Sequence, residues 1–147
     1  MSDFKNFKRD IMMRISKMEI PEEDGFWPEA IFMEDKTGNE QIVYIDELRD
    51  FSNENNVSVE ELVTDVIKEE NPKNLALVFE TRILFMEGHE KSVLSLLIGD
   101  IMDLECYEAS YYEDKGMLKL ENFETLHKED YPDEALAVRR AMTYQNE

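Results

Sequence analysis

The chain has one cysteine, Cys106, with five glycines and four prolines among 147 residues. A single cysteine excludes an internal disulfide framework and is typical of proteins from a reducing compartment. Five glycines leave little material for a glycine-rich phosphate-binding loop, and no such motif occurs. The longest unbroken apolar run, Leu75 to Phe79, is far too short to span a membrane. These absences predict a cytoplasmic protein with neither a membrane segment nor a nucleotide cofactor.

Basic residues are scarce as well. The chain has 16 Lys and Arg against 35 Asp and Glu, which gives a formal net charge of −19. Residues 1–18 depart from this balance, because five bases and two acids give them +3 and leave −22 for the remainder. Such a field repels nucleic acid and anionic membranes and attracts basic surfaces at rates that fall with salt. The alternative is that the acidity only keeps the protein soluble.

Residues 1–18 predict a basic amphipathic helix. Apolar residues recur at steps of three and four, which is the pattern of a helix with one apolar face; they are Phe4, Phe7, Ile11, Ile15 and Met18. We expect this stripe to dock on the protein's own body, with the helix's bases against the body's acids.

The remaining periodicities predict a single α+β domain over residues 1–147. Residues 28–45 predict a hairpin around Gly38. Residues 46–71 predict helices, one of which begins at the capping box Ser58-x-x-Glu61. Residues 74–123 alternate apolar runs with short polar connections, which indicates an antiparallel meander. Residues 133–145 predict a closing helix. The expected fold is one antiparallel meander sheet plus the N-terminal hairpin, with about four helices packed over one face.

The predicted strand "NLALVFETRILFM" offers a buried charge candidate. Glu80 and Arg82 share its second face, between apolar residues at both ends. A carboxylate there is either a tuned functional group or half of a solvated ion pair. The apolar ends raise a further alternative: if the helices leave that face bare, it becomes a homodimer surface.

The chain contains no motif that marks a catalytic or metal centre. Asp100, Asp103 and Glu105 are weak candidates for a hard cation, but the alternating ligands and central glycine of an EF-hand are missing. His89 and His127 lack a second His or Cys at zinc-ligand spacing. We therefore expect no catalytic residue, no metal site and no cofactor, and hence a non-enzymatic protein.

The strongest functional indication is the stretch "IPEEDGFWPEAIFMED". An aromatic ring among carboxylates can bind an Arg- or Lys-rich surface. The alternative is that the ring folds over the sheet edge, because proline biases the residue before it toward extended backbone. The predicted partner-binding residues are Glu22, Glu23, Asp24, Trp27, Glu29 and Asp35.

These features predict an acidic interaction protein that binds a basic protein surface, such as that of a nucleic-acid-binding enzyme. In composition the chain resembles small acidic inhibitors made by phages and mobile elements, and the resemblance implies an inhibitor that mimics nucleic acid. Direct nucleic-acid binding is not expected, because it needs clustered Lys and Arg. The alternatives are a regulatory or scaffolding homodimer and a small carboxylate- or metal-dependent enzyme.

Overall fold

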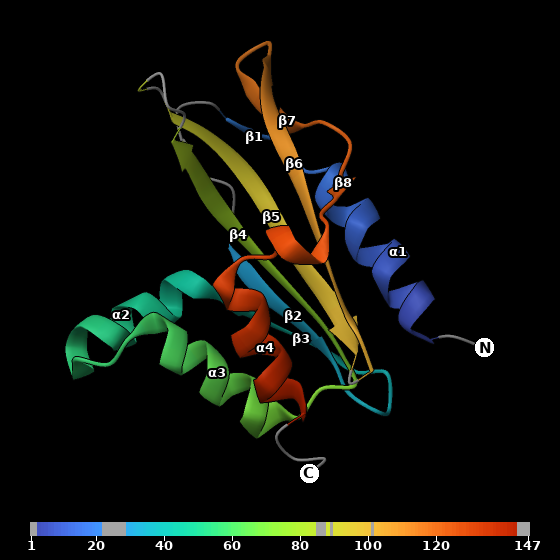
Figure 1. The fold of residues 1–147 in the computed structure, drawn as a ribbon, viewed down its shortest axis with the longest axis vertical. Coiled ribbons are helices and arrows are strands. Elements are labelled where there is room, and N and C mark those ends of the chain that lie inside the picture. Colours follow the sequence, from blue (N-terminus) through green and yellow to red (C-terminus); the bar gives the residue numbers. More distant parts are fainter. Residues whose placement is uncertain (1–2, 22–28, 85–87, 89, 101, 144–147) are drawn as a thin grey trace.

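Figure 1 shows a long, curled sheet with helices on both of its sides. The computed structural model describes residues 3–21, 29–84, 88, 90–100 and 102–143. Its helices are α1 (Asp3–Ser16), α2 (Ile45–Asn55), α3 (Val59–Glu70) and α4 (Asp133–Thr143), with a 3-10 turn at Lys128–Asp130. Its strands are β1 (Ile20–Pro21), β2 (Ala30–Glu34), β3 (Glu40–Tyr44), β4 (Asn74–Leu84), β5 (Glu90–Asp100), β6 (Leu104–Asp114), β7 (Met117–Leu120) and β8 (Glu124–Thr125).

All strand pairings are antiparallel. The strand order is β1-β7-β6-β5-β4-β2-β3, and β8 pairs with β6. The predicted α+β class, with its meander and N-terminal hairpin, is confirmed. The sequence did not predict β1, β8 or the 3-10 turn, because two or three residues are too few to show a periodicity.

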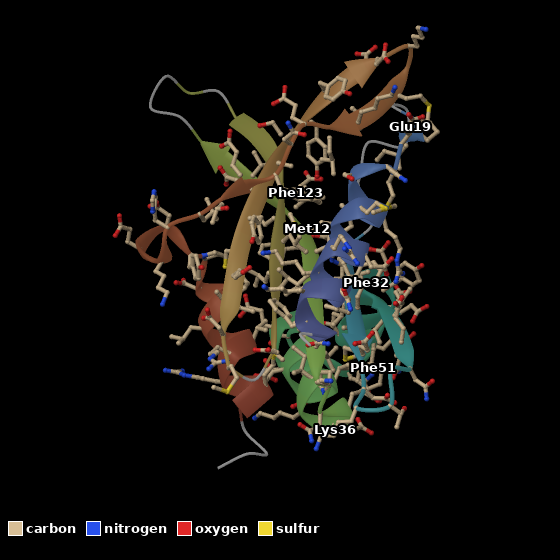
Figure 2. All side chains as sticks on the ribbon, turned by 90° about the vertical axis from the view of Figure 1, so that its right-hand side faces the viewer. Met12, Glu19, Phe32, Lys36, Phe51 and Phe123 are labelled. Carbon is tan, nitrogen blue, oxygen red and sulfur yellow. The ribbon has the colours of Figure 1, made fainter. Side chains whose placement is uncertain are left out.

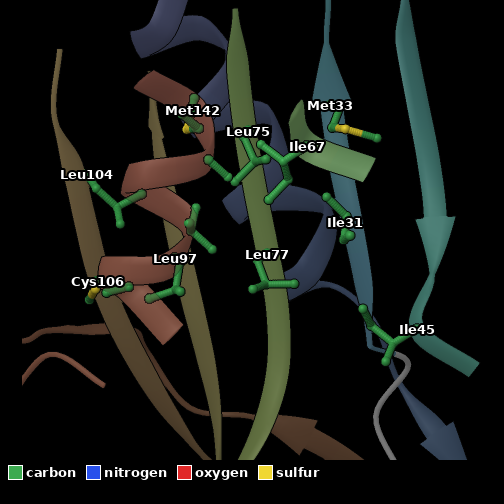
Figure 3. Packing of buried hydrophobic residues seen from close by; sticks show 13 residues of the cluster. Ile31, Met33, Ile45, Ile67, Leu75, Leu77, Leu97, Leu104, Cys106 and Met142 are labelled. Atoms are coloured by element: carbon green, nitrogen blue, oxygen red, sulfur yellow. The ribbon is translucent and has the colours of Figure 1, made fainter. Parts of the chain in front are cut away.

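The helices cover both faces of the sheet, so the expectation that they lie over one face is wrong. Successive residues of a strand point to opposite faces. Leu75 and Leu77 of β4 pack with α3 and α4 on one face, as Figure 3 shows, whereas Ala76 and Val78 pack with α1 on the other. The face of β4 that could have been a homodimer surface is therefore covered by α1 of the same chain in this stretch.

The docking predicted for the first helix is confirmed. Phe7, Ile11 and Ile15 are buried against the sheet. Lys8 Nζ lies 2.6 Å from Glu105 Oε1, and Arg14 forms an ion pair with Glu40. Each buried side chain of this size stabilises the fold by about 1.5–3 kcal/mol, against about 0–1 kcal/mol for a part-exposed ion pair. The apolar stripe therefore holds α1 in place, and the ion pairs add little.

The N-cap bond of the predicted capping box is present at the start of α3. Ser58 Oγ accepts a hydrogen bond of 3.1 Å from Glu61 N. At the other end Asn71 adopts the left-handed conformation, its N–H bonds to Ile67 O, and Pro72 follows. Both signals are local, which is why the sequence located this helix well. None of the described helices has the length and apolarity needed to cross a membrane.

Candidate functional site

Four of the six predicted residues of the partner-binding stretch fall in the segment 22–28, between β1 and β2. Glu22, Glu23, Asp24 and Trp27 lie outside the described residues. Their role as an acidic, aromatic contact stays a prediction.

The two described members of that stretch do not share a patch. Glu29 precedes β2 and Asp35 follows it, so about 20 Å of strand separates them. Glu29 is half-buried; its carboxylate accepts Glu80 N at 2.9 Å and forms an ion pair with Arg49. Asp35 instead closes the β2–β3 loop. The structure therefore gives each carboxylate an intramolecular role.

The Asp35 turn has an electrostatic consequence. Its carboxylate accepts the Thr37 hydroxyl at 2.6 Å, Asn39 N at 3.0 Å and Thr37 N at 2.8 Å. These bonds, the Thr37 hydroxyl first, hold the pKa of Asp35 below its ordinary value of 3.8.

We expect Asp35 to make the hairpin acid-sensitive. Because its pKa is lower in the folded chain, its contribution to stability is present above the unfolded pKa and is lost as pH falls through the folded one. A carboxyl-carbon NMR titration should place its midpoint below 3.8. The destabilisation by Asp35→Asn, measured by urea unfolding, should shrink from about pH 7 to about pH 3. A midpoint above the ordinary value contradicts this account.

The buried charge candidate is partly described. Glu80 is half-buried in β4, and its N–H donates to Glu29. Arg82 pairs through its backbone with Ser92 of β5, and its side chain lies outside the described part of the structure. The ion pair between Glu80 and Arg82, and the alternative of a tuned functional carboxylate, both stay predictions.

The three metal candidates are not brought together. Asp100 Oδ1 accepts Met102 N at 2.9 Å and Asp103 N at 3.1 Å, which closes the β5–β6 turn, and Asp103 Oδ1 accepts Leu104 N. Glu105 faces α1, where it binds Lys8 and accepts the Tyr107 hydroxyl at 2.9 Å. Among the described residues, no three His, Cys, Asp or Glu side chains form a group that could hold a metal ion.

Cys106 packs in the core, as its alternation in the strand predicted. It lies on β6, on the face of the sheet that α4 covers, and burial raises the pKa of its thiol to about 12. A thiol with that pKa is almost entirely protonated at neutral pH, so it is a poor nucleophile.

A concentrated acidic surface lies on α2 and α3 instead. Residues 45–70 hold nine carboxylates and two cations, Arg49 and Lys68, and all nine carboxylate residues are exposed. The apolar positions of the same helices, such as Leu48, Val63 and Ile67, pack into the core and leave the acids outside. We call this surface the acidic layer, and it consists of Asp46, Glu47, Asp50, Glu54, Glu60, Glu61, Asp65, Glu69 and Glu70.

An apolar groove of about 200 Å³ borders the acidic layer between α2, α3 and α4. Its walls include Val63, Phe79 and Val138, and acids of α3 and α4 stand at its rim. A protein cavity of about 150 Å³ admits a benzene ring, so this groove has room for one large apolar side chain. Phe51, 50% exposed on α2, adds an aromatic ring to the layer (Figure 2).

Arg49 is held at the edge of the groove. It forms ion pairs with Glu29 and, at 2.9 Å, with Asp46. The hydrogen bond to Glu29 raises the pKa of the guanidinium further, so the group stays charged. One of the layer's two cations is thus already engaged by carboxylates of the chain itself.

Sequence reasoning missed the acidic layer. The acids of α2 and α3 alternate with apolar residues, so no single stretch is as dense as the one before Trp27. A count of acids per predicted helix face would have found it. No protein-family model matches the chain, and neither a curated protein nor a solved structure matches it.

Proposed function

We propose that this chain is a non-enzymatic interaction protein that binds a basic protein surface through the acidic layer. The observation that carries the proposal is the exposure of all nine carboxylates of α2 and α3 beside an apolar groove. The carboxylates attract and orient a cationic surface, and the groove with Phe51 offers the desolvated contact that such a complex needs for affinity.

The charge density of the layer supports one kind of target, a protein whose own basic groove normally holds nucleic acid. The longer of the two helices, α3, has 12 residues and is therefore about 18 Å long. Its five carboxylates give about 3.6 Å of helix per charge, against about 3.4 Å along one strand of duplex DNA, and the four carboxylates of α2 add to them. More specifically, we propose that the chain is an inhibitor that mimics nucleic acid and acts in a reducing compartment.

The layer can be tested with two variants of equal net charge. One neutralises four layer acids by Glu47→Gln, Asp50→Asn, Glu61→Gln and Asp65→Asn. The matched control neutralises four exposed acids elsewhere by Glu113→Gln, Glu121→Gln, Glu124→Gln and Glu129→Gln. Both keep side-chain size and change exposed residues, so both should fold normally.

We expect the wild type to capture a basic, nucleic-acid-binding protein from a cell lysate at about 50 mM salt and to lose most of it at about 200 mM. With the captured protein purified, the layer variant should bind at least tenfold more weakly, about 1.4 kcal/mol, while the control variant changes little. Equal losses in the two variants would mean that net charge alone attracts the partner. Binding that salt does not weaken, or capture of no basic protein, would refute the proposal.

A further inference from the structure

The two edges of the sheet differ in how well they are protected. β1 has two residues, one of them proline, which cannot donate to a neighbouring strand. β3 has five residues in continuous register with β2, with no bulge, proline or lysine, and its one charged residue is Glu40 at the first position. Natural edge strands usually carry one of those devices against strand addition. Among the described residues, no strand pairs with the outer edge of β3.

Two hydrogen bonds fix the direction of the β3 backbone. Ile45 N donates to Glu29 O at 3.0 Å, and Asp35 N donates to Asn39 O at 2.9 Å. Bonded and non-bonded pairs alternate along an antiparallel ladder. Gln41 and Val43 therefore turn their N–H and C=O groups toward β2, and Ile42 turns both of its groups outward. Tyr44 turns its N–H outward, whereas its C=O belongs to the first turn of α2, because Tyr44 is the N-cap of that helix.

The side chains of the outward residues are exposed too. Ile42 is 38% exposed and Tyr44 48%, and the alternation puts both on one face of the strand. Ile42 lies opposite Phe32 of β2, whose ring is covered by the Arg14 guanidinium 6.0 Å from its centroid. An added strand would thus find both backbone partners and an apolar cross-strand surface.

We propose that the outer edge of β3 receives an extended, cationic segment of another protein as an additional strand. Residues 40–50 contain four exposed acids and one arginine, a net charge of −3. α2 follows β3 without a break, so a segment on this edge continues toward the acidic layer. A second copy would bring the same acidic edge against itself, because a twofold contact pairs identical surfaces. A cationic segment with apolar residues at alternate positions suits both charge and spacing.

The proposal shares the cationic partner with the proposed function, but it concerns a different surface and needs no natural partner for its test. The probe is a capped synthetic peptide of alternating Lys and Val, about six residues long. A Lys–Pro peptide keeps the charge but cannot form a strand, and a Glu–Val peptide keeps the strand pattern with the opposite charge. Amide hydrogen exchange of β3, followed by NMR, reports pairing residue by residue.

In the free protein the amides of Ile42 and Tyr44 should exchange quickly, and saturating Lys–Val peptide should slow both at least tenfold. The amides of Gln41 and Val43, bonded to β2, should change little, and neither control peptide should slow Ile42 or Tyr44. Slow exchange in the dilute free protein would mean that the chain covers its own edge. If exchange at Ile42 and Tyr44 slows with protein concentration alone, the edge binds a second copy of the chain. If the Lys–Pro peptide also slows it, the peptide binds through its charge and not as an added strand. Each of these results overturns the proposal.

Ile42→Pro provides the matching variant. It removes an N–H that points away from β2, so the ladder to β2 keeps its bonds, and peptide affinity should fall at least tenfold. If this variant does not fold, Ile42→Lys adds a like charge to the edge and should weaken peptide binding as well. Unchanged affinity in a folded variant refutes strand addition. Because the peptide replaces the natural partner, failure of the lysate experiment would leave this result standing.

Discussion

Replacing Ile11 by aspartate should destabilise the fold by about 5 kcal/mol, the largest effect we expect of any single substitution discussed. Ile11 is 0% exposed, at the centre of the stripe that α1 packs on the sheet. The variant loses that apolar contact and puts a carboxylate against residues such as Val78, Leu94 and Leu96, which offer no side-chain hydrogen-bond donor. Since a domain of this size is stable by about 5–15 kcal/mol, urea unfolding should show a much lower midpoint or no folded state.

Met13→Asp is the control for that change. Met13 lies on the same helix, two residues away, and is 47% exposed. The substitution adds the same charge to the same helix and loses at least as much helix propensity, yet it buries nothing, so its effect should stay within about 0.5 kcal/mol. Ile11→Ala, which leaves a cavity but no charge, should cost about 2–5 kcal/mol and remain measurable if the aspartate variant does not fold. Similar effects of the two aspartate variants would show that α1 is not docked through Ile11.

The role of α1 explains why the sequence predicted the class of fold better than its layers. Period-two and period-three-to-four patterns are local, so the strands and helices could be recognised directly. The arrangement of helices depends on contacts such as Lys8 with Glu105, which lie 97 residues apart. The two-faced apolar pattern of Leu75 to Val78 did indicate that both faces need cover. It could not say that one N-terminal helix covers the second face.

The candidate site shows the same limit. The density of acids drew attention to residues 20–35, yet Asp35 closes a turn and Glu29 binds Arg49. The acidic layer arises because α2 and α3 pack their apolar positions inward, which leaves all nine of their carboxylate residues exposed. This gathering is a property of the packed helix pair, so charge counted along the chain understates it.

Gly99→Ala should destabilise the fold by about 3 kcal/mol, because the obstacle it meets is backbone. A Cβ at this position of β5 would lie 2.3 Å from Asp103 O and 2.9 Å from the Leu104 Cα. The Asp103 carbonyl accepts Asp100 N at 3.0 Å in the β5–β6 turn, so moving it breaks that bond. Urea unfolding measures the loss.

Gly38→Ala separates steric obstruction from backbone strain. Gly38 has φ +88° and open space around it, so alanine there should cost about 1 kcal/mol from conformation alone. Adding Leu104→Ala to Gly99→Ala tests the nature of the obstacle, since it removes the side-chain contact at 2.9 Å but leaves the carbonyl in place. We expect the double variant to be less stable than either single one. If it instead regained stability over Gly99→Ala, the Leu104 side chain would be the obstacle, and the tight β5–β6 turn would not be what requires glycine at this position.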